Sequence, residues 1–356
     1  MIQFPKPLVP GDTLAITAFS SGIEPHHESR FDLIKSHLQS QGFNLRIGRC
    51  LFGNHKFVSA SKEDRAKELM SFLLDDTVAA VAPPWGGELA IELLPLLDFE
   101  ALAKARPKWI FGFSDVSTLT ATLTAKLGWA TAHTPNLMDL VPDQSDALTP
   151  FTLARLATTA GENFIQHASS HIYDWPDFEN QPLAPLVKGR PTRWQWLNQP
   201  EDRDSVQGVL LGGCLDTLCH LVQTDYLNLT KFKAQHGQVI FFLENVELAP
   251  ADVVRVLHSF DFRGVFTAVD ALLLGRNFRK DSGNPEDLTY DEAITEFFSQ
   301  PRFQQLPIMT QVDFGHVPPN LTLINGAYGK LTLNDQEAFI QQWMGTKPNN
   351  LLEKEA

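Results

Sequence analysis

Three residues of this chain carry the side chains that hydrolysis of an amide or ester by a serine nucleophile requires. Ser114 follows a short apolar run and precedes residues 116–126, whose apolar spacing predicts a helix. Glu244 ends a second apolar run, and His316 lies in a loop of glycine and proline. A serine hydroxyl needs a base to become nucleophilic, and histidine needs a carboxylate to hold its tautomer. The three residues supply one group for each role.

Each of these residues also has a structural interpretation. Ser114 could cap the helix that follows it, because serine and aspartate are favoured at that position. Glu244 could pair with a buried arginine such as Arg276, and His316 is one of eleven histidines, most of which serve no catalytic purpose in a typical protein. The residues alone leave both interpretations open.

Strands and helices must position these groups, and the pattern of residues 1–150 alternates between the two. Strands are predicted at 13–17, 43–47, 77–82, 108–111 and 129–131. Helices are predicted at 27–41, 61–74 and 116–126, and a further one follows Gly87 and runs through Leu94. This alternation predicts an α/β fold with a mostly parallel sheet covered by helices on both faces. Ligands of such sheets bind at the carboxyl ends of the strands. We therefore expect Ser20, Gly87 and Ser114, which follow three of these strands, to converge.

The rest of the chain divides further. We expect an N-terminal domain at 1–160, an interdomain excursion rich in proline and tryptophan at 161–206, a C-terminal domain at 207–345 and a flexible polar tail at 346–356. The C-terminal part resumes the alternation and includes an Asn-Gly turn between two predicted strands. Three tryptophans of the excursion are candidates to line a ligand groove, or alternatively to pack it against a domain: Trp175, Trp194 and Trp196.

Composition narrows the function classes. The chain has 356 residues, a net charge of −13 and three cysteines without CxxC spacing. An acidic chain with no basic run argues against nucleic-acid and anionic-membrane partners, and scattered cysteines favour a reducing cytoplasm. His26, His27 and Glu28 lack metal-site spacing, and no glycine-rich nucleotide fingerprint is present. We expect a cytoplasmic protein that needs no metal and no cofactor.

Six segments of the chain, taken together, resemble the LD-carboxypeptidase family of serine peptidases, which includes the microcin C immunity peptidases. The resemblance spans nearly the whole chain, and its segments are 10–16, 76–87, 107–117, 212–215, 242–245 and 315–318. The segment Gly112-Phe113-Ser114-Asp115-Val116-Ser117 is similar to the nucleophile motif of the family. The chain departs from the family pattern at five places, none of which removes a triad member. Phe113 replaces tyrosine, Cys214 replaces asparagine and Asn245 replaces aspartate. The segment Pro83-Pro84-Trp85 is bulkier and stiffer than usual, and His133-Thr134-Pro135 lacks the usual glycine before proline.

The resemblance implies a fold and a set of roles. The fold would be a Rossmann-like N-terminal domain with a smaller C-terminal β-containing α/β domain, usually in a homodimer. Ser114 would be the nucleophile, His316 the general base and acid, and Glu244 the group that orients His316. The backbone N–H groups of Gly87 and Asp115 would form the oxyanion hole, which agrees with their positions at two predicted helix starts.

Two substrates compatible with this resemblance are a murein tetrapeptide, cut at an L,D bond to release D-alanine, and a peptidyl or aminoacyl adenylate. We rank the murein peptide first because immunity is a narrower role, although the tryptophan-rich excursion offers rings on which an adenine could stack. A third hypothesis is a non-catalytic small-molecule binding protein in which Ser114 is only a cap. In each case the expected partner is a small peptide or peptidyl-nucleotide, with no nucleic acid and no membrane.

Overall fold

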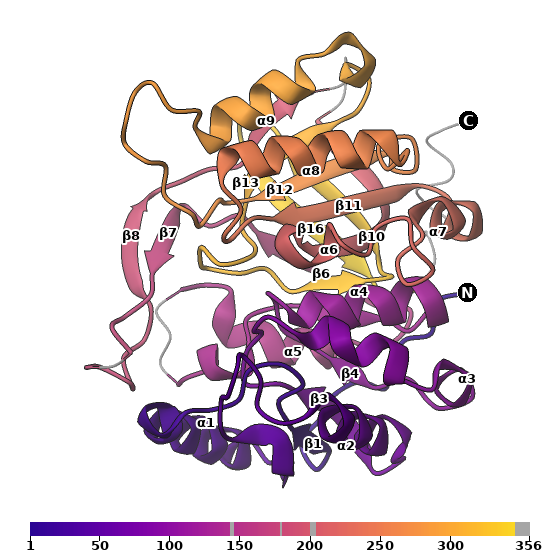
Figure 1. The fold of residues 1–356 in the computed structure, drawn as a ribbon, viewed down its shortest axis with the longest axis vertical. Coiled ribbons are helices and arrows are strands. Elements are labelled where there is room, and N and C mark those ends of the chain that lie inside the picture. Colours follow the sequence, from indigo (N-terminus) through magenta and orange to yellow (C-terminus); the bar gives the residue numbers. More distant parts are fainter. Residues whose placement is uncertain (143–145, 179, 200–203, 346–356) are drawn as a thin grey trace.

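The computed structural model describes residues 1–142, 146–178, 180–199 and 204–345. The tail predicted to be flexible, 346–356, lies outside the described residues. Figure 1 shows two layered halves, with a parallel sheet in the N-terminal half and a larger sheet in the C-terminal half. Within the described residues, no helix combines the length and the apolar character needed to cross a membrane.

The N-terminal half contains a four-stranded parallel sheet in the order β2-β1-β3-β4, which confirms the α/β prediction. Its strands are β1 (Thr13–Ile16), β2 (Asn44–Ile47), β3 (Val78–Ala82) and β4 (Trp109–Ile110). Its helices are α1 (Glu28–Ser40), α2 (Lys62–Leu74), α3 (Phe99–Leu102), α4 (Val116–Leu127) and α5 (Thr152–Leu156). The helix expected after Gly87 is a 3₁₀ helix, η3 (Ala90–Leu96), which contains Pro95. A proline lacks the N–H that an α-helix interior needs.

The C-terminal half is built on an eight-stranded mixed sheet in the order β6-β16-β15-β10-β11-β12-β13-β9. Its strands are β6 (Asn163–His167), β9 (Gln195–Asn198), β10 (Ser205–Cys214), β11 (Val239–Glu244), β12 (Ala271–Gly275), β13 (Ile308–Val312), β15 (Tyr328–Leu333) and β16 (Ala338–Trp343). Its helices are α6 (Leu215–Leu218), α7 (Leu229–His236), α8 (Pro250–Phe262) and α9 (Tyr290–Phe298). Strands β6 and β9 come from the 161–206 excursion and form the two edges of this sheet. The excursion also contains the separate pair β7 (His171–Asp174) and β8 (Val187–Pro191).

Helix α4 lies between the two sheets, and the segment that carries Ser114 leads directly into its first turn (Figure 1). Every residue from Val116 to Thr124 is buried, which suits a sequence of apolar residues and threonines with no charge before Lys126. Three of the four threonines in this stretch have a partner for the hydroxyl: Thr120 and Thr124 donate to backbone carbonyls, and Thr118 donates to the Asp115 carboxylate. Thr124 Oγ1, for example, donates to the carbonyl of Trp129 at 2.6 Å. The helix ends at Gly128, whose φ of +72° suits glycine.

The predicted Asn-Gly turn is present, but the strands on either side of it do not pair with each other. Strand β14 (Leu323–Asn325) pairs with β5 (Thr131–His133), while β15 pairs with β10. The turn therefore divides the chain between two sheets and ties the C-terminal half to the N-terminal half. The strand expected at 129–131 lies two residues later, as β5, because residues 131–133 are the ones that pair with β14.

Candidate active site

Ser114 occupies a strained turn between β4 and α4. Its φ is +65°, a left-handed conformation that non-glycine residues rarely adopt and that is concentrated at functional sites. The N-cap of α4 is Asp115, and no side chain makes a capping hydrogen bond there. Within the described residues, the Ser114 hydroxyl makes no hydrogen bond to the first turn of the helix. The capping interpretation of Ser114 therefore has no support in the geometry.

The Asp115 side chain holds the surrounding loops together. It is 1% exposed and accepts hydrogen bonds from Ser20 Oγ at 2.6 Å, the Ala90 N–H at 2.7 Å and Thr118 Oγ1 at 2.9 Å. Burial raises the pKa of this carboxyl, while these donors act in the opposite direction. The contacts join segments that follow β1, β3 and β4, so the carboxyl ends of the three strands converge as predicted.

Glu244, buried at the end of β11, pairs with His316, whose side chain is partly exposed. Glu244 Oε2 lies 2.9 Å from His316 Nδ1 and accepts the His316 backbone N–H at 3.3 Å. Burial opposes the charge of Glu244, but the facing His316 holds the pKa of Glu244 below its usual range. Burial would likewise lower the pKa of His316, but the Glu244 carboxylate raises it above its ordinary value. The alternative partner for Glu244 is engaged elsewhere, because Arg276 pairs with Asp313.

The loop that carries His316 is fixed from several sides. Trp175 Nε1 donates to the His316 carbonyl at 2.8 Å, and Arg276 Nη1 donates to the Val317 carbonyl at 3.1 Å. The ring of Phe113 meets the imidazole edge to face at a centroid distance of 4.7 Å. Gly315 has a φ of +99°, and a Cβ at this position would overlap the Glu244 side chain. The close approach of the histidine loop to Glu244 therefore requires glycine.

The two amides expected to form an oxyanion hole are placed beside the nucleophile. Neither the Gly87 N–H nor the Asp115 N–H donates a hydrogen bond within the part of the chain that the structure describes. A Cβ built on Gly86 would lie 2.6 Å from Ser114 Cβ, 2.7 Å from the Asp115 nitrogen and 2.8 Å from Ser114 Oγ. Ser114 Oγ and the Asp115 amide therefore face the same small space, which a side chain at position 86 would fill.

Two cavities meet at Ser114, Gly87 and His316, with volumes of about 400 and 310 Å³. Within the described residues, no hydrogen bond joins the Ser114 hydroxyl to His316, and such bonds are often long in free enzymes. The smaller cavity is acidic. Burial raises the pKa of Glu88 there, and so do the neighbouring carboxylates, among them Glu247. A third cavity of about 720 Å³ shares His316 with both of them and Trp175 with the larger one, so the open space around His316 extends beyond Ser114.

Of the three tryptophans, the structure brings one to the cleft. Trp175 lines the larger of the two cavities at Ser114. Trp194 is 2% exposed and donates to Asp313 Oδ2 at 2.7 Å, and Trp196 donates to the Leu333 carbonyl at 3.1 Å. Neither lines a cavity that contains Ser114. Both belong to the packing of the C-terminal half, the alternative that the sequence left open.

Two acidic residues of the site were not found by sequence reasoning. Asp139 lines the larger cavity, where burial raises its pKa to about 6. Its Asn136-x-x-Asp139 spacing is a capping-box signal, which predicts a helical turn but not a position in the cleft. Asp216 accepts hydrogen bonds from three consecutive amides, residues 246–248, at 2.8–3.1 Å and so fixes the loop after Glu244. A lone aspartate in the first turn of a short helix carries no sequence signal for this role.

Side chains of the types that bind metals gather at two places within the described residues. One group is Glu24, His26 and His27, and the other is Cys214, Glu244 and His316. The second group contains two triad members that already pair with each other. A protein without a resident metal remains our prediction for this chain.

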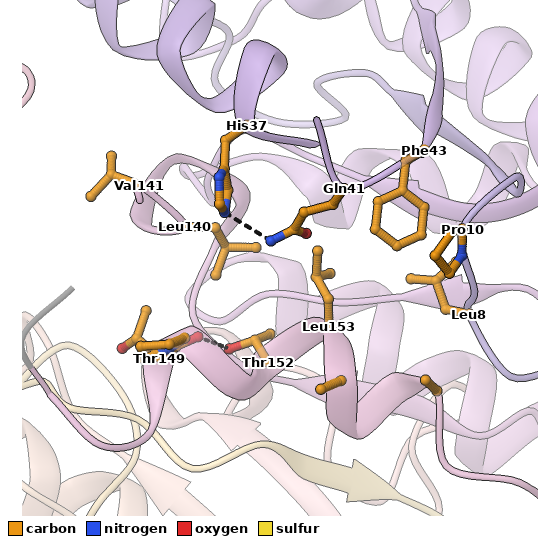
Figure 2. A pocket seen from close by; sticks show the side chains of 13 residues that line it. Leu8, Pro10, His37, Gln41, Phe43, Leu140, Val141, Thr149, Thr152 and Leu153 are labelled. Atoms are coloured by element: carbon orange, nitrogen blue, oxygen red, sulfur yellow. Dashed lines mark hydrogen bonds between the residues drawn. The ribbon is translucent and has the colours of Figure 1, made fainter. Parts of the chain in front are cut away.

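A further cavity of about 290 Å³ lies apart from these residues (Figure 2). Figure 2 shows His37 and Gln41, near the end of α1, facing Leu140 and Leu153 across it. None of the candidate catalytic residues lines this cavity, so it is not part of the active site.

Two segments of the sequence match the two domains of a known protein family. Residues 14–134 match the LD-carboxypeptidase N-terminal domain, and residues 207–331 match the LD-carboxypeptidase C-terminal domain. The microcin C7 self-immunity protein of Escherichia coli is 25% identical over 358 residues, which cover 96% of this chain and 96% of that protein. A probable murein peptide carboxypeptidase of Bacillus subtilis is 23% identical over 339 residues, 95% of this chain and 94% of the relative.

A solved structure shares the fold. The microcin C7 self-immunity protein in complex with aspartyl sulfamoyl adenosine superposes with a TM-score of 0.79 at 23% identity, and the match covers 96% of this chain and 98% of the other.

Proposed function

Because this chain belongs to the LD-carboxypeptidase family, we propose that it is a serine carboxypeptidase that hydrolyses a peptide amide bond with Ser114, His316 and Glu244. The observation that carries this proposal is the pairing of His316 with the buried Glu244, because His316 lines the same two cavities as a serine held at φ +65°. A serine, a paired histidine and a buried carboxylate have the three roles of a hydrolytic triad.

The chemistry follows from these positions. Ser114 Oγ attacks the carbonyl carbon of the substrate, while His316 accepts the hydroxyl proton and Glu244 stabilises the resulting imidazolium. The N–H groups of Gly87 and Asp115 donate to the oxyanion, a contribution worth on the order of 10²–10³ in rate per donor. The intermediate collapses, the C–N bond breaks and the leaving amine takes the proton from His316. A water molecule, deprotonated by His316, then attacks the ester and regenerates Ser114.

The substrate that we rank first is a murein tetrapeptide, from which cleavage of an L,D bond releases D-alanine. The acidic lining of the smaller cavity, with Glu88, Asp216 and Glu247, favours a substrate that presents an amino group on that side of the nucleophile. The two cavities on either side of Ser114 also suit a peptide that extends beyond the scissile bond. We further propose that the enzyme acts in the cytoplasm as a homodimer.

A second substrate class is a peptidyl or aminoacyl adenylate. Trp175 favours it, because this half-buried indole lines the cavity at Ser114 and offers a face on which a nucleobase can stack. The microcin C7 self-immunity protein has been solved in complex with aspartyl sulfamoyl adenosine, a compound that joins an aminoacyl group to an adenosine. An enzyme that uses it would lose binding affinity for the nucleotide on Trp175→Ala, whereas binding of a murein tetrapeptide would change less.

One experiment separates these proposals from a binding protein without catalysis. Wild-type protein and Ser114→Ala are incubated with murein tetrapeptide, and separately with an aminoacyl adenylate analogue that has a cleavable amide, and the products are measured by mass spectrometry. We expect product from the wild type only. Binding of either compound without turnover by the wild type would contradict the proposed peptidase.

A further inference from the structure

A second histidine lies beneath the active site and has no role in the proposed reaction. His133, on β5, is 1% exposed, and neither of its ring nitrogens has a hydrogen-bond partner within the described residues. Burial of a polar group without a partner costs free energy, so such a group in a native structure calls for an explanation. Packing alone would be served better by an apolar ring.

The neighbours of His133 connect it to the whole triad. Its ring contacts Phe113, Phe242 and Phe314 at centroid distances of 6.4, 5.4 and 5.9 Å. Each of these phenylalanines is one or two positions before a triad residue in the sequence: Phe113 precedes Ser114, and the other two precede Glu244 and His316 by two positions. The imidazole is therefore the common contact of three chain segments that converge from β4, β11 and the loop after β13.

Glu244 has a carboxylate oxygen that can accept a hydrogen bond from this imidazole. Oε2 is engaged by His316, and the nearby Cys214 thiol also stabilises the carboxylate, but Oε1 is buried and accepts no hydrogen bond of ordinary length among the described residues. Side chains two positions apart on a strand point to the same face, so Glu244 and Phe242 lie on one side of β11. Because His133 packs on Phe242, it lies on that side too.

The charge state of His133 suits a neutral donor. Burial lowers its pKa to about 4, although the Glu244 carboxylate acts in the opposite direction. Near neutral pH the ring therefore carries one N–H and one acceptor nitrogen. A neutral group can stabilise the carboxylate without competing with the imidazolium that His316 becomes during catalysis.

We propose that His133 is a positioning residue, whose neutral imidazole holds the three triad segments in register and directs an N–H toward the side of Glu244 that His316 does not use. This inference rests on the proposed hydrolase and names a residue that supports its triad. Its consequence is that the nitrogen atoms of His133 matter for the reactivity of Ser114, beyond the space that the ring fills.

The test measures the nucleophile directly and needs no knowledge of the natural substrate. Full-length protein reacts with a fluorophosphonate, and mass spectrometry follows the modification of Ser114 at several pH values. We expect His133→Phe, which keeps a ring and removes both nitrogens, to slow labelling on the order of tenfold, the equivalent of losing one hydrogen bond to a charged group. The acid limb of the rate should move to higher pH, because Glu244 without the donor holds the proton of His316 more strongly.

Three other titratable groups near Glu244 and His316 are unchanged in the His133 variants, so they cannot cause a difference between these variants and the wild type. Cys214 and Asp216 lie on the β10 side of Glu244 and His316, and Asp139 lies across the larger cavity. His133→Gln, which restores an N–H, should recover much of the rate and return the acid limb toward its wild-type position. The matched control is His236→Phe: His236 packs on Phe232 at 4.5 Å and lines neither cavity at Ser114.

The outcomes are distinct. A His133→Phe protein with the wild-type rate and pH profile would overturn the inference, as would a rate that falls equally in the phenylalanine and glutamine variants with an unchanged acid limb. Circular dichroism and thermal unfolding verify that each variant is folded, and His133→Met removes the nitrogens where phenylalanine does not fit. A wild type that is not labelled at Ser114 would contradict the hydrolase itself, and with it this role for His133.

Discussion

Gly86→Ala tests whether the space beside Ser114 is the place where the reaction occurs. The φ of Gly86 lies outside the left-handed region, so the backbone accepts alanine and the substitution adds only a methyl group. That methyl group would lie 2.6 Å from Ser114 Cβ and 2.7 Å from the Asp115 nitrogen. Carbon atoms normally approach to about 3.5 Å, so the two must separate by roughly 1 Å.

A displacement of this size has a predictable effect on rate. A misplacement of about 1 Å between reacting groups costs on the order of 10²-fold, and the methyl group also occupies the approach to the Asp115 N–H. We expect kcat/KM for murein tetrapeptide to fall about 10²-fold or more in Gly86→Ala. The assay is release of D-alanine, with thermal unfolding measured in parallel.

The matched control is Gly345→Ala, where the nearest heavy atom to the new Cβ is the Gly161 nitrogen at 3.9 Å and φ again lies outside the left-handed region. This variant should retain wild-type kcat/KM. If folded Gly86→Ala turned over the peptide like the wild type, the space beside Gly86 would not be the site of attack, and the assignment of the nucleophile and oxyanion hole would be refuted.

Three further predictions follow from the triad and its supports. Glu244→Gln removes the charge that raises the pKa of His316, so kcat should fall on the order of 10³–10⁴-fold. The acid limb of kcat/KM should also move to lower pH, and an unchanged pH profile would exclude the pairing. Trp175→Phe removes the hydrogen bond to the His316 carbonyl but keeps a ring. In steady-state kinetics kcat should fall about fivefold, the equivalent of one net hydrogen bond, while KM changes little. A change in KM instead of kcat would show that the indole only binds substrate. Arg276→Met leaves the Asp313 carboxylate buried without its positively charged partner. The free energy of unfolding, measured by urea titration, should fall by about 3–5 kcal/mol. A loss below about 1 kcal/mol would show that the ion pair adds little to stability.

The residues that follow strands were the most predictable part of this site. Ser114 and Glu244 stand where an apolar run ends, and in an α/β sheet that position places a side chain at the carboxyl edge. The periodicity of residues 116–126 predicted α4, because a helix leaves its signature in local spacing. The sequence could not show that this helix is buried between two sheets, since that depends on the C-terminal half.

Positions set by distant segments were not predictable. Trp194 and Trp196 resemble groove residues in the sequence, but their destination depends on β9 joining the edge of the C-terminal sheet. The Asn-Gly turn suggested paired strands, yet β14 finds its partner in β5, almost two hundred residues earlier in the chain. The setting of His133 depends on phenylalanines from three separate segments, and no local pattern announces it.

The most direct test of the central claim is release of D-alanine from murein tetrapeptide, followed by mass spectrometry in wild type and Ser114→Ala at equal concentrations of folded protein. The account predicts release by the wild type and none above background by the variant. Release by Ser114→Ala at the wild-type rate would contradict the claim that Ser114 is the nucleophile.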